Sequence, residues 1–140
     1  MMRVTGAACL AALGLLAVGA AAPAQAPAQP PAALALLETG LWELRDLEAS
    51  APPARLCISD LRQLLQPVQP EPLCKHFIAE DGGGRTAVAY DCAARGRGRT
   101  SLRVETPRLL QIDSQGVVDG RPFDMRYEAR RLGTCKAASR

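Results

Sequence analysis

The cysteines are the residues of this chain whose type and spacing bear most directly on chemistry. Cys74 lies two positions before His76, the single histidine, and Cys57 precedes both. Zinc prefers thiolate and imidazole ligands, so these three residues could form a partial metal site. An exported chain oxidises its thiols instead, and Cys57, Cys74, Cys92 and Cys135 are an even set. We therefore expect two disulfides, with no metal and no cofactor.

The pairing of these cysteines has three possible solutions. Residues 74–80 and 85–92 flank an Asp-Gly-Gly-Gly turn at 81–84, which predicts a β-hairpin. Folding about this turn brings Cys74 beside Cys92. We predict Cys74–Cys92 within the hairpin and Cys57–Cys135 between an early strand and the last one. The alternative, Cys57–Cys74 with Cys92–Cys135, stays open.

A run of alternating arginine and glycine, with Arg95, Arg97 and Arg99, is the one concentrated charge in the sequence. In an extended conformation all three side chains would point the same way and could bind phosphate or carboxylate groups. Lipid head groups or an anionic envelope polymer would be suitable partners. The simpler interpretation, which we favour, is a flexible, solvated loop.

Residue patterns typical of enzymes do not occur. Ser59, Ser101 and Ser114 lie in no Gly-x-Ser-x-Gly context, and His76 has no recognisable relation to any of them. The adjacent carboxylates at 80–81 fall at a predicted turn, where side chains are solvated. The sequence therefore predicts a protein that is not an enzyme.

Overall composition restricts the partners. The 140 residues carry a net charge of +3 and one Trp, two Tyr and two Phe. This balance is too mild for a nucleic-acid partner, and so few aromatic residues offer little surface for stacking bases or sugars. We expect no nucleic acid. The partners that remain open are an apolar small molecule, an anionic lipid or another envelope protein.

The N-terminal residues predict export. A short basic start, an unbroken apolar run over residues 7–22 and a small-x-small site ending at Ala24 are typical of a cleaved signal peptide, residues 1–24. The apolar run is too short and too rich in Ala and Gly for a permanent membrane helix. Cys9 lies within this segment. Residues 25–38 are predicted as an Ala/Pro-rich tether, residues 39–136 as the folded domain and residues 137–140 as a tail, in a periplasmic or secreted protein.

Strict alternation near the C terminus predicts a half-buried β-strand. From Phe123 the apolar residues fall on one side and charged residues on the other, with Met125 and Tyr127 on the apolar side and Arg126 on the charged one. The apolar side is either core or the wall of a ligand cavity. The charged side reads as a solvated face that discourages edge pairing.

Weaker alternation recurs along the rest of the chain. It predicts strands over residues 41–47, 55–58, 74–80, 85–92, 100–105 and 108–114, with Trp42 in the core. Ser59 and Asp60 precede leucines at helical spacing, which predicts one short helix over 60–66. The fold class is mostly β: a single antiparallel meander of about seven strands, curled into a half-barrel or small barrel.

Two short motifs resemble landmarks of a known family. Gly40-Leu41-Trp42-Glu43 near the predicted mature start is similar to the Gly-x-Trp-Glu opening of domain-of-unknown-function family 3617. The ending over residues 130–136 resembles the closing Arg-x-Ile/Leu-Gly-x-Cys pattern of that family. Its members are bacterial exported proteins, so the resemblance implies export, paired cysteines and a mostly β domain. It implies no activity, and the middle of this chain departs from the Gly/Met-rich family pattern.

These observations lead to one favoured function and two alternatives. We expect a non-enzymatic envelope domain whose curved sheet holds a small apolar molecule or docks another envelope protein. The first alternative is a purely structural or stress-associated envelope protein. The second is an unrecognised hydrolase.

Overall fold

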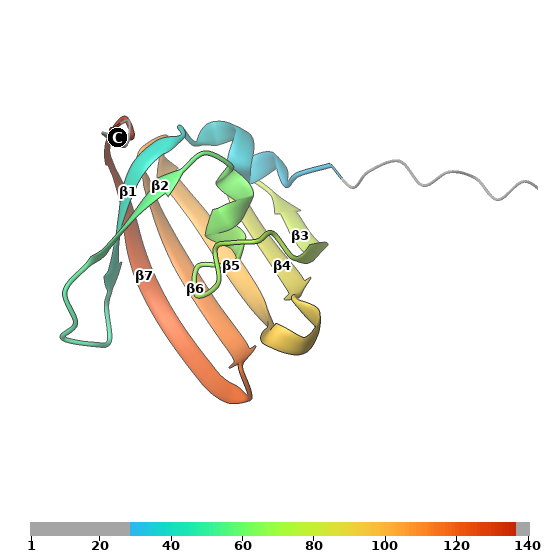
Figure 1. Cartoon of the computed structure of the whole chain (residues 1–140). Helices are drawn as coiled ribbons and strands as arrows, with labels where there is room; N and C mark the ends of the chain where they lie inside the picture. The colour runs from blue at the N-terminus through green and yellow to red at the C-terminus, as the bar shows by residue number, and fades with distance from the viewer. Residues whose placement is uncertain (1–28, 137–140) are drawn as a thin grey trace, which may run out of the picture.

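The alternating stretch near the C terminus forms β7 (Arg121–Gly133), an interior strand of a seven-stranded antiparallel sheet (Figure 1). The computed structural model describes residues 29–136. The other strands are β1 (Gly40–Asp46), β2 (Ala54–Ile58), β3 (Lys75–Gly82), β4 (Arg85–Asp91), β5 (Gly96–Thr106) and β6 (Leu109–Val118). Short 3-10 turns form η1 (Ala32–Leu36), η2 (Leu61–Leu65) and η3 (Ala93–Arg95). The mostly β fold with about seven strands is confirmed.

The strand order is β2-β1-β7-β6-β5-β4-β3. Strands β3 to β7 form a continuous meander, and β1 pairs along the free side of β7. The sheet stays open, with β2 and β3 at its two edges, as expected of a half-barrel. One connection departs from simple meander order. The chain leaves β2 at one edge, passes through η2 over the curved face of the sheet and enters β3 at the other edge (Figure 1).

The core lies between the concave side of the sheet and the two turns η1 and η2. Trp42 and Leu44 point into it from β1, and Leu64 and Leu65 of η2 cover them from the opposite side; all four are buried. Burying a large apolar side chain contributes about 1.5–3 kcal/mol, so this filled interior is the main stabilising feature of the fold. The apolar side of β7 ends in the same core at Ala129.

The fold begins earlier than the sequence predicted. Leu34 and Leu37 fall within the range assigned to the tether, yet both are buried and belong to the core cluster. The indole nitrogen of Trp42 donates a hydrogen bond to the carbonyl oxygen of Glu38 at 3.0 Å, which fixes this segment over the sheet. The predicted signal peptide, the first residues of the tether and the tail at 137–140 lie outside the described residues.

The predicted helix over 60–66 is the 3-10 turn η2. Asp60 caps it: its side chain accepts from the backbone nitrogen of Arg62 at 3.0 Å, and the Gln63 side chain accepts from the Asp60 nitrogen at 3.3 Å. This reciprocal capping box satisfies donors at the start of the turn. Pro67 removes a backbone donor just beyond it, so the turn stays short.

The prediction of a flexible loop over residues 95–99 was wrong. η3 ends at Arg95, and β5 starts at Gly96 and pairs with β6 through Gly96↔Val118, Arg97↔Val117 and Arg99↔Gln115. Residues 115–118, beyond the predicted strand over 108–114, form the end of β6 for the same reason. Two long neighbouring strands offer a complete ladder of hydrogen bonds, which outweighs the weak strand preference of glycine.

Candidate functional site

The residues of the Arg-Gly run lie on the two faces of the strand that replaces the predicted loop. Arg97 and Arg99 are both exposed on the outer, convex face of β5 because residues two apart in a strand share a face. Gly98 between them lies on the concave face, opposite Tyr90 of β4 and Gly116 of β6. The strand thus separates the run into a charged outer row and a glycine on the inside.

Two glycines allow β5 and β6 to approach closely at this point. A Cβ added at Gly116 would lie 2.6 Å from the Cα of Gly98, and one added at Gly98 would lie 2.5 Å from the Tyr90 hydroxyl oxygen. Real Cβ atoms do not approach other atoms this closely, so both positions require glycine. The Tyr90 ring fills the inner space over Gly98 and is itself 2% exposed.

An open hollow of about 440 Å³ lies on the outer face above this pair of glycines. Strands β3 to β6 supply its lining. Phe77 and Val117 are its exposed apolar residues, with 58% and 37% of their surface accessible, and Arg97 and Arg99 are its basic residues. Ala89 on β4 lies between Phe77 and Arg99 and, being small, leaves the hollow open. An apolar floor beside two guanidinium groups is suited to a ligand with an apolar part and an anionic part.

The two arginines of the hollow are only lightly engaged by acidic groups. Arg99 approaches the Glu80 carboxylate at 3.8 Å, with both side chains more than half exposed. Among the described residues Arg97 makes no ion pair, and Asp91 opposite it accepts a hydrogen bond from the Ala93 nitrogen at 2.8 Å. An exposed pair at such a distance contributes little, so both guanidinium groups are available to a ligand.

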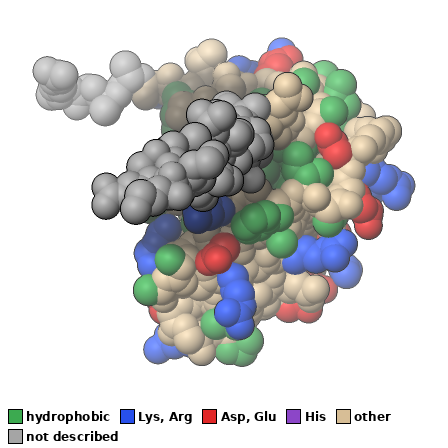
Figure 2. Space-filling view, turned by 90° about the vertical axis from the view of Figure 1, so that its right-hand side faces the viewer, with side chains coloured by type: hydrophobic (Ala, Val, Ile, Leu, Met, Phe, Trp, Pro, Cys, Tyr) green, Lys and Arg blue, Asp and Glu red, His purple; other side chains and the backbone are tan. Residues whose placement is uncertain are grey.

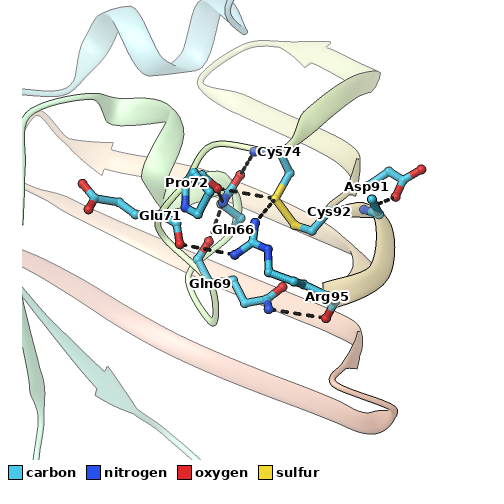
Figure 3. Close-up of a disulfide and its surroundings, with 9 residues drawn as sticks. Gln66, Gln69, Glu71, Pro72, Cys74, Asp91, Cys92 and Arg95 are labelled. Atoms are coloured by element: carbon cyan, nitrogen blue, oxygen red, sulfur yellow. Dashed lines mark hydrogen bonds between the residues drawn. A yellow bond between two sulfur atoms is a disulfide. The ribbon is translucent and has the colours of Figure 1, made fainter.

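The third predicted anion-binding residue, Arg95, lies elsewhere. Its guanidinium donates to the carbonyl oxygen of Glu71 at 3.4 Å and to the Cys74 sulfur at 3.7 Å, beside the disulfide (Figure 3). Its own carbonyl accepts from the Gln69 side chain at 3.4 Å. Arg95 therefore holds the crossing segment against η3 and does not join Arg97 and Arg99. The grouping of all three arginines was wrong because η3 ends between them.

Both preferred disulfides are present. Cys57 is bonded to Cys135, with 5.6 Å between their Cα atoms, and Cys74 is bonded to Cys92, with 4.8 Å between theirs. The first bridge fastens β2 to the residues just after β7, and the second fastens the start of β3 to the end of β4. Because Cys57 and Cys74 belong to different bridges, they are not available as zinc ligands. Within residues 29–136 no group of three or more His, Cys, Asp or Glu side chains is arranged to hold a metal.

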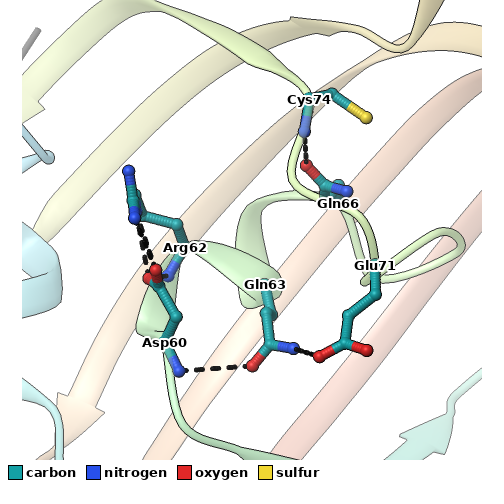
Figure 4. Close-up of polar contacts among 6 residues, drawn as sticks. All are labelled: Asp60, Arg62, Gln63, Gln66, Glu71 and Cys74. Carbon is teal, nitrogen blue, oxygen red and sulfur yellow. Dashed lines mark hydrogen bonds and ion pairs between the residues drawn. The ribbon is translucent and has the colours of Figure 1, made fainter.

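Gln66 organises the segment that crosses the sheet, and sequence analysis missed it. Its side chain is fully buried; its amide nitrogen donates to the carbonyls of Gln69 and Pro72, and its oxygen accepts from the Cys74 nitrogen at 2.9 Å. Nearby, the Gln63 amide donates to the Glu71 carboxylate at 2.6 Å (Figure 4). These hydrogen bonds satisfy backbone polar groups in a segment that has no regular secondary structure. The surrounding polar contacts thus have a structural role.

His76 lies on the inner face of β3 beside Tyr90, with 6.4 Å between ring centroids. Its Nε2 atom is buried without a hydrogen-bond partner among the described residues. Burial lowers the pKa of His76; the Arg62 charge lowers it further, whereas Asp60 opposes the change. The hydrogen bond from Arg62 in turn lowers the pKa of the Asp60 carboxyl. The environment of His76 thus favours the neutral form of its imidazole.

The serines considered as nucleophiles are separated. Ser114 is buried, and its hydroxyl shares a hydrogen bond of 2.8 Å with Thr100 on the concave side. Ser101 lies on the opposite, outer face of β5, and Ser59 lies in the link between β2 and η2. Burial raises the pKa of the Tyr90 hydroxyl, with Ser114 opposing the change. Thr100, Ser114 and Tyr90 thus form a small polar layer at the edge of the core.

Comparison with known proteins adds no relative: no protein-family model, curated protein or solved structure matches the chain. The similarity of its two end motifs to family 3617 therefore stays an expectation. Within residues 29–136 no helix has the length and apolar character that crossing a membrane requires.

Proposed function

We propose that this chain is an exported, non-enzymatic domain of the bacterial envelope that binds an anionic lipid surface through the outer hollow. Export is supported by the two disulfides, which persist in oxidising compartments such as the periplasm or the extracellular space. The N-terminal sequence, with its basic start and apolar run, supports the same location.

The observation that carries the proposal is the juxtaposition of exposed apolar and basic side chains on one face. Phe77 and Val117 offer apolar surface, and Arg97 and Arg99 extend from the strand between β4 and β6. Amphipathic surfaces of this kind bind membranes by burying apolar groups at the head-group level while basic groups attract anionic lipids. Arginine also forms paired hydrogen bonds with phosphate oxygens.

The opposite, concave side supports a different role. An apolar ligand on the concave side of the sheet was one expectation, but leucines of η1 and η2 fill part of that side. The Tyr90 ring and the half-buried side chains of Phe123 and Met125 line the rest of the concave side. The concave side therefore contributes to the stability of the fold, and we assign lipid binding to the outer side.

A flotation experiment tests the proposal. The folded, disulfide-bonded protein is mixed with vesicles of phosphatidylcholine alone or with added phosphatidylglycerol. We expect binding to the anionic vesicles only, decreasing as salt is raised because exposed charges are screened. Equal binding to both vesicle types, or none to either, would contradict it.

A further inference from the structure

β3 is an edge strand with an unusually apolar middle. It pairs with β4 on one side, and within the described residues its other side has no strand. Phe77 and Ile78 at its centre are 58% and 45% exposed, on opposite faces. Figure 2 shows this side of the molecule, where hydrophobic side chains lie among acidic and basic ones. Such an edge is a template for pairing with another strand.

Charges along β3 are segregated by sign. The basic residue Lys75 begins the strand, and the acidic residues Glu80 and Asp81 end it. Protective charges on an edge repel an incoming strand only if like charges meet. In an antiparallel arrangement centred on Ile78, the basic half of one β3 lies along the acidic half of another. The strand is therefore complementary to itself.

The direction of the backbone groups suits this arrangement. Gly83 and Gly84, at φ +58° and +73°, form a two-residue turn, so Gly82 and Arg85 form a hydrogen-bonded pair. Such pairs alternate along an antiparallel ladder, and the register shifts between Ile78 and Glu80. Counting along the ladder through this bulge, Phe77 and Glu80 bond to β4, whereas His76 and Ile78 direct their backbone groups outward.

We propose that two copies of this chain form a symmetric dimer by antiparallel pairing of their β3 edges. Ile78 of one copy lies opposite Ile78 of the other at the twofold axis, so Lys75 of each copy faces the acidic end of the other, with Asp81 opposite it and Glu80 beside Asp81. The interface is the same patch on both subunits, as required of a closed dimer. The axis runs perpendicular to the sheet, so both outer hollows open to the same side.

Glu80 and Lys75 allow a test that separates pairing from folding. Both are exposed, and the ion pair of Glu80 with Arg99 is long, at 3.8 Å. We expect concentration-dependent dimers of the parent chain by sedimentation equilibrium without lipid. Lys75→Glu and the double variant Glu80→Lys/Asp81→Lys should each be monomeric because like charges then meet. A one-to-one mixture of the two variants should dimerise again, since the acidic end positions of each chain then face residues of opposite charge on the other.

The outcomes are decisive in both directions. A parent chain that stays monomeric to its solubility limit would overturn the proposal. Dimers that persist in both variants, or a mixture that fails to restore dimers while each variant keeps its circular dichroism spectrum and both disulfides, would also overturn it. Because no vesicles are present, the result does not depend on lipid binding by Arg97 and Arg99.

Discussion

The hydroxyl oxygen of Tyr90 lies 2.5 Å from the position that a Cβ of Gly98 would take. We predict that Gly98→Ala lowers the free energy of unfolding by about 1–3 kcal/mol, the usual cost of overpacking a rigid site. Chemical denaturation measures it. Gly133→Ala is the matched control, because a Cβ there meets nothing within 4 Å. In a Tyr90→Leu background the same Gly98→Ala change should cost less; an unchanged cost would exclude this contact as the cause.

Gln66 supplies a second prediction about stability. Gln66→Met keeps the volume but removes the amide that serves Gln69, Pro72 and Cys74. Because buried polar groups then lose their partners, we expect a loss of about 2–3 kcal/mol in the free energy of unfolding. Gln115→Met, at an exposed position, should change it by less than about 0.5 kcal/mol. Similar small effects for both would contradict the role of Gln66.

The two disulfides are expected to contribute unequally. Cys57–Cys135 closes a separation of 78 residues and Cys74–Cys92 one of 18. Loop-closure entropy gives about 4.5 kcal/mol for the first and about 3 kcal/mol for the second. Replacing each pair by alanine should therefore lower the thermal midpoint more for Cys57/Cys135. The reverse order would show that native contacts outweigh the effect on the unfolded chain.

His76 predicts a pH dependence of stability. Its pKa is lowered in the folded protein from an ordinary value of 6.5, mainly by burial. Between the pKa of His76 in the folded protein and its pKa in the unfolded chain, the unfolded chain binds more protons than the folded protein. The free energy of unfolding therefore rises with pH in this range. The stability is complete above about pH 6.5 and is lost as pH falls through the folded pKa.

Two measurements check this dependence. His76 is the single histidine, so a proton NMR titration of the dilute protein reports its pKa without assignment. His76→Gln should flatten the pH dependence of unfolding between pH 5 and 7, relative to the parent. A titration midpoint at or above 6.5 would contradict the effect of burial.

Local sequence pattern predicted most of the strands and both bridges. The alternation in β7 and the triple glycine after Asp81 are signals within a few residues, and they determined a strand and a hairpin. The place of β1 beside β7 and the crossing between opposite edges depend on contacts between distant residues. No local period carries that information.

The candidate site was predicted only in part, for a similar reason. Arginines two residues apart were recognised, but their glycine spacers suggested a loop because the pairing of β5 with both neighbours lies outside the run. Phe77 was assigned to a strand, yet its place beside Arg97 and Arg99 depends on sheet order. Gln66 gave no signal, because a buried glutamine and an exposed one look alike in a sequence.

Binding of anionic vesicles by an arginine variant tests the central proposal most directly. Arg97→Gln with Arg99→Gln removes two charges from the hollow, and each basic residue near such a surface contributes about 1 kcal/mol. Arg126→Gln with Arg130→Gln is the matched control, since it removes the same charge from the same face at residues paired with Asp113, Glu48 and Glu128. We predict binding about 30-fold weaker for Arg97/Arg99 and much less change for the control. Equal losses in the two variants would show a general charge effect and contradict a site at the hollow.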